Sequence, residues 1–101
     1  MGKESVSESG NPTKERINNM KFQAKVTVSL KEGVLDPQGK TIGNALRDLE
    51  FDNILKVNTG RLFILDIEAE SQTEASKIAS EAAAKLLANP VIEQFKVEVL
   101  L

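Results

Sequence analysis

Cysteine and histidine are both absent from this chain of 101 residues. Without thiols, the chain cannot form disulfides, thiolate-based zinc sites or a thioester intermediate, and its composition suits a reducing cytoplasm. Without imidazole, it lacks the commonest general base and the commonest nitrogen ligand for metals, which excludes most hydrolase triads. The sequence therefore predicts no catalytic, cofactor-binding or metal-binding residues in this chain, and a cytoplasmic location.

Aromatic residues, excess charge and long apolar runs are also scarce. The only aromatic residues are four phenylalanines, and the formal net charge is -2. Phe22, Phe63 and Phe95 fall on the apolar phase of predicted strands, so we assign them to the core rather than to an RNA-stacking surface. No apolar run is long enough to span a bilayer, and the N-terminus lacks the apolar middle of a signal peptide. These features predict neither a nucleic-acid nor a membrane partner.

The first 19 residues are polar and contain almost nothing that can pack in a core. Ordering them would cost entropy with little apolar burial to offset it, so residues 1–19 are predicted to be a flexible N-terminal tail. The remainder, residues 20–101, is long enough for a single domain with a modest core.

In the first half of this domain, a strand-like pattern of apolar residues is followed by a helix-like one. Residues 22–30 are apolar at every second position, which is typical of a strand with one buried face. Asp36 followed by Pro37 is typical of a helix N-cap and first turn, and apolar residues then keep helical spacing to Leu49.

The second half contains a predicted hairpin, a second helix and a last strand. Residues 54–57 and 62–69 form strand-like runs on either side of a turn-like segment and predict a hairpin. Ser71 and Glu74 have capping-box spacing before a second helical pattern, which Asn89 and Pro90 end. Residues 95–101 alternate again. The order βαββαβ predicts an α+β protein of ferredoxin-like fold, with a four-stranded antiparallel sheet and two helices on one face.

Carboxylates on the predicted third strand are the first candidates for chemistry. Asp66, Glu68 and Glu70 share one face of that strand. They alternate with the apolar Leu65 and Ile67, so we interpret them as the solvent side of the strand rather than as a catalytic or metal site.

Three glycines raise the question of a phosphate-binding loop. Gly33, Gly39 and Gly43 are too widely spaced and wrongly flanked for such a loop. Gly39 and Gly43 lie four residues apart on the first predicted helix, which favours a close approach of its backbone to the sheet or to a neighbour.

The predicted third strand is apolar on both faces in its first half. Leu62 and Ile64 point opposite to Phe63 and Leu65, and Leu100 does the same in the last strand. Helices cover only one side of a ferredoxin-like sheet, so the second apolar face favours burial against another subunit.

Two stretches of sequence resemble the signature segments of a known family. Residues 28–39 read Val-Ser-Leu-Lys-Glu-Gly-Val-Leu-Asp-Pro-Gln-Gly, and residues 85–93 read Lys-Leu-Leu-Ala-Asn-Pro-Val-Ile-Glu. Both resemble signature segments of the PurS family at the expected separation, and the resemblance covers roughly residues 20–99. The chain departs from the family at Asn58, where members often have arginine, although Arg61 supplies a positive charge in the same turn.

The resemblance implies a small subunit of phosphoribosylformylglycinamidine (FGAM) synthase, which converts formylglycinamide ribonucleotide to formylglycinamidine ribonucleotide in purine biosynthesis. In that family, a large synthetase subunit binds ATP, magnesium and the ribonucleotide, and a separate glutaminase releases ammonia. A dimer of the small subunit helps to join them. The chain is therefore expected to be non-catalytic, to form a dimer or tetramer, and to contact both other subunits.

The two signature stretches and the adjacent turn also supply the predicted partner-contact residues, because they lie at helix ends or in loops. These residues are Asp36, Pro37, Gln38, Gly39, Arg61, Asn89 and Pro90. A purely structural role as helix caps and turn formers stays open for Asp36, Pro37, Asn89 and Pro90.

Two alternatives belong to other classes of function. Small-molecule-binding regulatory domains share the βαββαβ order, but they are usually appended to an enzyme and lack the Leu-Asp-Pro-Gln-Gly run. A free-standing enzyme would need turnover by this chain alone, which the missing histidine and cysteine disfavour.

Overall fold

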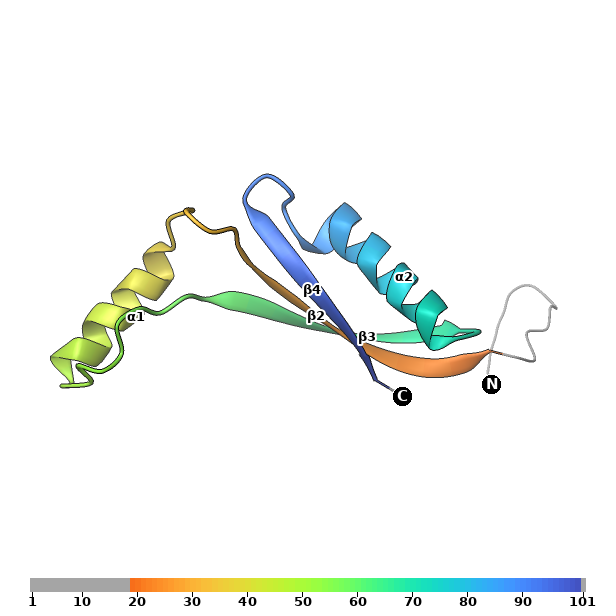
Figure 1. Cartoon of the computed structure of the whole chain (residues 1–101), viewed down its shortest axis with the longest axis horizontal. Coiled ribbons are helices and arrows are strands. Elements are labelled where there is room, and N and C mark those ends of the chain that lie inside the picture. The colour runs from red at the N-terminus through yellow and green to blue at the C-terminus, as the bar shows by residue number, and fades with distance from the viewer. Residues whose placement is uncertain (1–18, 101) are drawn as a thin grey trace, which may run out of the picture.

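The computed structural model describes residues 19–100, so residues 1–18 of the predicted tail and Leu101 lie outside the described residues. Six elements follow one another along the chain (Figure 1). They are β2 (Met20–Leu30), α1 (Pro37–Asp48), β3 (Gly60–Ala69), α2 (Gln72–Ala82), the π-helical turn η1 (Ala83–Leu87) and β4 (Glu93–Leu100). None of the helices within this part of the chain is long and apolar enough to cross a bilayer.

The sheet is antiparallel, with β2 at its centre and the order β3-β2-β4. In the register, Val26 of β2 lies opposite Phe63 of β3 and Val97 of β4. The α+β class is therefore confirmed, but the described residues form three strands rather than the predicted four.

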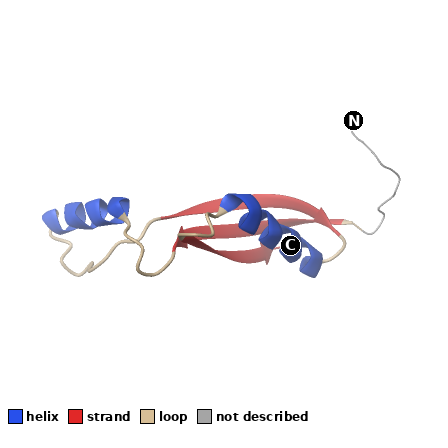
Figure 2. Ribbon diagram, turned by 90° about the horizontal axis from the view of Figure 1, so that it is seen from above, coloured by secondary structure: helices blue, strands red, loops and turns tan. Residues whose placement is uncertain are grey.

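The core lies between this sheet and α2. Val26 and Val28 of β2 are fully buried, as are Ala75 and Ala79 of α2. Alanines let the helix axis approach the sheet closely, and each buried valine contributes roughly 1.5–3 kcal/mol relative to an exposed one. The alternating pattern of β2 and the helical spacing of α2 thus meet in two adjoining core clusters, one with Val26, Val28 and Ala79 and the other with Phe22 and Ala75. Figure 2 shows α2 lying against the strands.

Helix α2 begins and ends largely as its residues indicate. The Ser71 hydroxyl accepts a hydrogen bond from the Glu74 amide at 3.1 Å, and the Glu74 carboxylate accepts one from the Glu70 amide at 2.7 Å. The carboxylate thus reaches one residue further back than in a standard capping box. At the other end, Ala88 N–H donates to the Ala83 carbonyl at 2.9 Å across five residues, which defines the π-helical turn before Asn89.

The predicted strand at residues 54–57 does not form, and the hairpin that was predicted there is therefore wrong. The reason lies in contacts with α1. Arg47 donates hydrogen bonds to the carbonyl oxygens of Ile54 and Leu55 at 3.1 and 3.4 Å. Two of the carbonyls in this segment are thus bonded to an arginine side chain on α1 rather than to a neighbouring strand.

The prediction that both helices cover one face of the sheet is also wrong. Only α2 packs on the sheet, whereas α1 projects beyond the sheet end (Figures 1 and 2). Together with the segments that flank it, α1 forms a projection that we call the arm, residues 31–59. The arm gives the molecule an elongated shape, with extents of 59 × 27 × 19 Å.

The arm turns back on itself just after α1. Glu50 N–H donates to the Arg47 carbonyl at 2.9 Å, and Phe51 N–H donates to the Leu46 carbonyl at 3.0 Å. This pair of bonds is the Schellman motif, which places the residue after the C-cap in the left-handed region. Glu50 occupies that position with φ 72°, where glycine is more usual. The turn directs residues 54–59 back along α1 toward β3.

Candidate partner-contact site

The seven predicted contact residues fall into two clusters. Asp36, Pro37, Gln38 and Gly39 lie at the start of α1 in the arm. Arg61, Asn89 and Pro90 lie where β3 begins and where the chain passes from η1 to β4. Glu93 joins Arg61 to Asn89, whereas Asp36 is bonded to Thr59, two residues before Arg61. No hydrogen bond within residues 19–100 joins Asp36 itself to Arg61 or Asn89.

Asp36 ties the start of α1 to the segment before β3. One carboxylate oxygen, Oδ1, accepts a hydrogen bond from Gly39 N–H at 2.8 Å, as expected of the predicted N-cap. The other, Oδ2, accepts one from Thr59 N–H at 2.7 Å, and the Thr59 hydroxyl lies 3.1 and 3.0 Å from the two oxygens. We call Asp36, Gly39 and Thr59 the helix-start clamp.

Gly39 is required at its position because the chain passes very close to it. A Cβ atom there would overlap the carbonyl oxygen of Val57, and it would lie only 2.9 Å from Asp36 Oδ2. The predicted close approach at Gly39 is confirmed, and its partner is the residue 57 backbone rather than the sheet. At Gly43, an added Cβ would meet only Arg47 at 3.4 Å and the Val57 side chain at 3.7 Å.

The helix-start clamp should make the arm sensitive to acid. Hydrogen bonds from the Thr59 N–H and then the Gly39 N–H hold the pKa of Asp36 below its ordinary value of 3.8, and Lys56 adds a smaller effect in the same direction. A depressed folded-state pKa means that the clamp stabilises the arm fully above the unfolded pKa and loses this contribution as pH falls through the folded pKa. We expect the Thr59 amide to exchange faster with solvent hydrogen as pH falls below about 4, after correction for the intrinsic exchange rate.

Two variants separate the charge of Asp36 from its hydrogen bonds. Asp36→Asn should be less protected than the parent chain at neutral pH and should show little of the acid-dependent loss. Thr59→Val, which keeps the amide donor and removes the hydroxyl, should keep most of the pH dependence. An Asp36→Asn profile that follows the parent profile throughout would contradict the assignment.

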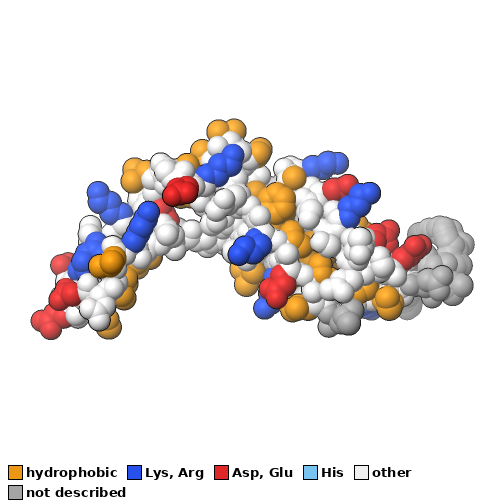
Figure 3. Space-filling view, viewed as in Figure 1, with side chains coloured by type: hydrophobic (Ala, Val, Ile, Leu, Met, Phe, Trp, Pro, Cys, Tyr) orange, Lys and Arg blue, Asp and Glu red, His pale blue; other side chains and the backbone are white. Residues whose placement is uncertain are grey.

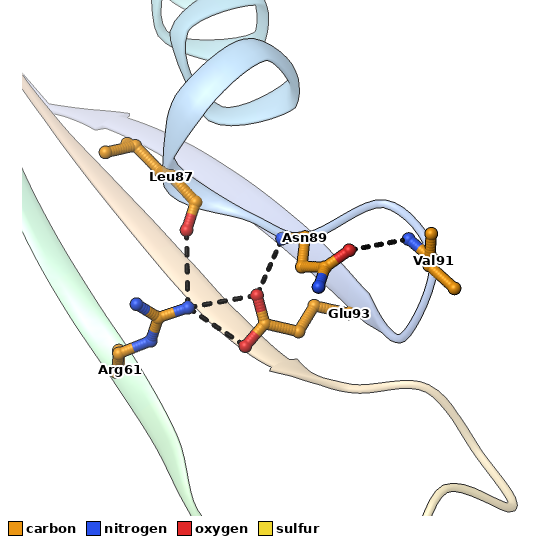
Figure 4. Close-up of polar contacts among 5 residues, drawn as sticks. All are labelled: Arg61, Leu87, Asn89, Val91 and Glu93. Carbon is orange, nitrogen blue, oxygen red and sulfur yellow. Dashed lines mark hydrogen bonds and ion pairs between the residues drawn. The ribbon is translucent and has the colours of Figure 1, made fainter.

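The second cluster joins β3 to the start of β4 through an ion pair (Figure 4). Arg61 Nη2 lies 3.0 and 2.9 Å from the two carboxylate oxygens of Glu93, and it also donates to the Leu87 carbonyl at 3.3 Å. Glu93 Oε1 in turn accepts from Asn89 N–H at 2.7 Å, and the Asn89 side chain accepts from Val91 N–H at 3.0 Å. These bonds hold the 88–92 loop in one shape.

Neighbouring groups extend this cluster. The Lys31 amine donates to the Pro90 carbonyl at 2.7 Å, and the Arg61 guanidinium lies 5.6 Å from the centre of the Phe63 ring. The side chain of Arg61 is 55% exposed and that of Glu93 is 16% exposed. An ion pair this open to water contributes about 0–1 kcal/mol, so its main effect is to fix geometry.

Some of the predicted contact residues are hydrogen-bonded within the chain, and others have free side chains within residues 19–100. Asp36 and Gly39 are bonded within the helix-start clamp, and Arg61 and Asn89 are bonded within the second cluster. Side chains that face solvent and have no hydrogen bond within residues 19–100 are those of Pro37, Gln38 and Pro90. Sequence reasoning missed Thr59 and Glu93; Glu93 ends the second signature stretch, whereas Thr59 gave no local signal.

The other candidates from the sequence behave as solvent-facing or core residues. Asp66, Glu68 and Glu70 are exposed, as predicted. Within residues 19–100, no three His, Cys, Asp or Glu side chains are grouped so as to hold a metal ion. Phe22 is buried and Phe63 is half-buried, but Phe95 is 36% exposed, so its assignment to the core is wrong. The pairing register still puts all three on the same sheet face. The open face of the three described strands therefore offers no aromatic platform for RNA bases.

Comparison with a protein-family model gives a match over residues 23–100 to PurS, described as phosphoribosylformylglycinamidine (FGAM) synthase. The chain is 47% identical over 74 residues to the FGAM synthase subunit PurS of Archaeoglobus fulgidus, which covers 73% of this chain and 92% of the relative. It is 41% identical over 78 residues to the PurS subunit of Bacillus subtilis, with coverages of 77% and 92%.

A solved structure of PurLQS from Thermotoga maritima contains a chain of similar fold. That chain is 33% identical to this one and superimposes with a TM-score of 0.75. The match covers 80% of this chain and 99% of the chain from Thermotoga maritima. The likeness therefore spans nearly all of the related subunit.

Proposed function

This chain belongs to the PurS family and is a subunit of FGAM synthase in purine biosynthesis, and we propose that it bridges the other two subunits of that ligase. The observation that carries the proposal is its match to a chain of the PurLQS complex of Thermotoga maritima. By this proposal, PurL is the synthetase partner and PurQ is the glutaminase partner. The regulatory-domain alternative gains no support from these comparisons.

The bridge has a chemical purpose in this reaction. Ammonia released into water at neutral pH is protonated and loses its nucleophilic lone pair. Holding the glutaminase and synthetase sites together, with water excluded between them, keeps ammonia reactive until it attacks its acceptor. A chain without cysteine or histidine supplies neither the thiol of a typical glutaminase nor an imidazole base, which supports a non-catalytic role. ATP and magnesium are proposed to bind the synthetase subunit.

Self-association, as a dimer or tetramer in the cytoplasm, is part of the same proposal. Several large apolar side chains are exposed on the single chain, among them Leu62 at 58% and Ile64 at 46% on the open side of β3. Apolar side chains grouped in this way favour burial against another protein surface.

Among the predicted contact residues, we place Pro37, Gln38 and Pro90 at the interface with the other subunits. Their side chains are exposed and make no hydrogen bond within residues 19–100. Asp36, Arg61 and Asn89, by contrast, use their side chains in hydrogen bonds that shape the loops presenting them. A rigid loop loses little conformational freedom on binding, which favours association.

Reconstitution with the cognate synthetase and glutaminase tests the bridging role. FGAM formation is measured with glutamine or with ammonium as the nitrogen source, each with and without this chain. We expect the chain to raise the glutamine-dependent rate at least tenfold and to leave the ammonia-dependent rate within about twofold, because only the first requires the two sites to be joined. Glutamine-dependent synthesis that is equally fast without the chain would refute bridging.

A variant of the exposed Gln38 tests whether the glutamine-dependent rate depends on the predicted contact with the other subunits. Gln38→Arg adds bulk and charge at an exposed position at the start of α1, and we expect it to weaken the complex and lower the glutamine-dependent rate. Thr73→Arg places the same change on the exposed first turn of α2 as the matched control. Complex size by light scattering in the presence of both subunits reports assembly directly.

A further inference from the structure

The arm contains a cavity between α1 and the segment that runs back along it, residues 55–58, which we call the return segment. The cavity has a volume of about 370 Å³. Gly43 lines it on the side of α1, and Val57 lines it on the side of the return segment. A volume of this size lies near the lower end of the range for small-molecule sites.

Three basic side chains line this arm cavity from both of its sides. Lys40 and Arg47 belong to α1, and Lys56 belongs to the return segment. Lys40 and Arg47 lie two turns apart on one side of the helix, with Gly43 between them. Because Gly43 has no side chain, the space between these two cations stays open. Figure 3 shows lysine and arginine side chains over the arm, at the left of the molecule.

The guanidinium of Arg47 is held in a fixed position at the cavity. Nη1 donates to the carbonyl oxygens of Ile54 and Leu55 at 3.1 and 3.4 Å, and Nη2 donates to Asn44 Oδ1 at 2.9 Å. These bonds leave the Nε–H and one Nη2–H without a partner within residues 19–100. A guanidinium that is already ordered loses little conformational freedom when it binds an anion.

No carboxylate within residues 19–100 forms an ion pair with these three cations. The ion pair among those residues joins Arg61 to Glu93, outside the arm. Asp36 also lines the cavity, but its oxygens already accept hydrogen bonds from Gly39 and Thr59. The cavity therefore has an excess of positive charge in a chain of net charge -2, which favours an anionic ligand.

The rest of the cavity wall is aliphatic. Val34, Leu35, Leu55 and Val57 line it, and Leu35 is 71% and Leu55 85% exposed. A bare phosphate ion would leave these side chains in water, whereas a phosphate that carries an organic group would cover them. Convergent cations beside aliphatic walls are thus suited to an organic phosphate.

We propose that the arm cavity binds a nucleoside monophosphate. Its phosphate contacts Arg47, Lys40 and Lys56, and its base lies against Leu35 and Leu55. The small volume favours one phosphate group over three. Because the cations come from both sides of the cavity, the bound ligand ties α1 to the return segment and stabilises the arm.

Nuclear magnetic resonance of the isotopically labelled full-length chain tests the site. AMP is the probe, and inorganic phosphate and adenosine are titrated separately. We expect AMP to shift the amide signals of Gly43, Lys56 and Asn58 to saturation, and inorganic phosphate and adenosine each to bind at least about tenfold more weakly.

Three outcomes of this titration would overturn the proposal. The first is the absence of shifts at these amides with AMP, and the second is a set of shifts confined to α2 and β4. The third is inorganic phosphate that binds as tightly as AMP, since the aliphatic walls would then contribute nothing to the affinity.

A double lysine variant tests the role of the cations. Lys40→Gln combined with Lys56→Gln removes two charges from the cavity without removing the acceptors of Arg47, and it should weaken AMP binding at least about tenfold. Lys77→Gln combined with Lys85→Gln removes the same charge at exposed positions on α2 and η1, and it should change the affinity less than about twofold. Equal affinities of the two double variants for AMP would contradict the site.

Hydrogen exchange measures the effect of the ligand on the arm. With AMP at saturation, the amides of residues 54–59 should exchange at least about fivefold more slowly, whereas those of β2 should be unchanged. AMP that binds without slowing exchange in this segment would show that the ligand does not tie it to α1.

These measurements use this chain alone, so their outcome is independent of the bridging role. A chain that binds no AMP but restores glutamine-dependent synthesis would leave bridging intact and refute the arm cavity as a site.

Discussion

Val26→Asp is expected to unfold this protein or to remove most of its stability. Val26 is fully buried at the centre of β2, between Phe63 and Val97 and beneath α2. A carboxylate there would lose its hydration without gaining a partner, because the core cluster contains only apolar residues. We expect a loss of about 4 kcal/mol or more, which is comparable with the whole stability of a small domain. Urea denaturation followed by circular dichroism measures it.

The adjacent residue provides a matched control. Thr27 is exposed on the opposite face of the same strand, across from Lys96 on β4. Thr27→Asp introduces the same carboxylate one position away, and it should change the free energy of unfolding by only about 0.5 kcal/mol. Similar losses in the two variants would mean that the sheet face is not assigned correctly.

Gly39→Ala is expected to destabilise the protein, whereas Gly43→Ala is expected not to. The two glycines lie one turn apart on α1, but a Cβ at residue 39 would overlap the Val57 carbonyl, whereas at residue 43 it would meet only a flexible arginine side chain and a methyl group. Overpacking against backbone costs roughly 1–3 kcal/mol, which exceeds the gain of about 1 kcal/mol from replacing glycine in a helix. Gly39→Ala should therefore destabilise the arm.

Gly43→Ala gains the higher helix propensity of alanine, and its Cβ does not overlap the backbone. It should therefore leave the free energy of unfolding unchanged or raise it by up to about 1 kcal/mol. Hydrogen exchange at the α1 amides separates an effect on the arm from an effect on the whole fold. If Gly39→Ala proves as protected as Gly43→Ala, residue 57 does not fix the path of the chain past the helix.

Features governed by local chemistry could be predicted from the sequence. Asp36 and Pro37 start α1 as expected, Ser71 starts α2, and the alternation of β2 buries the predicted face. These features depend on residues within one or two turns of each other, so the pattern alone carries the information. The PurS assignment also came from local stretches, residues 28–39 and 85–93, and the comparisons confirm it.

Features that depend on distant contacts could not be predicted in this way. Residues 54–57 have the composition of a strand, but Arg47 and Gly39 hold them against α1, and no periodicity reports that competition. The same contacts pair α1 with residues 54–57, and α1 lies beyond the end of the sheet. In the candidate site, Thr59 was missed because its partner Asp36 lies 23 residues earlier, whereas the first-turn bond to Gly39 was expected from the Asp-Pro pair.

The outer edge of β3 has a consequence for the protein while it is being made. Within residues 19–100, β3 pairs only with β2, so its other edge presents free backbone donors and acceptors over residues 60–69. Asp66 and Glu68 place negative charge along the second half, which opposes stacking of like strands, but residues 62–65 have no such protection. A chain synthesised in excess of its partner subunits therefore exposes the unpaired edge of β3, which favours aggregation. We expect balanced synthesis of the subunits, or prompt chaperone capture, to limit association through this edge.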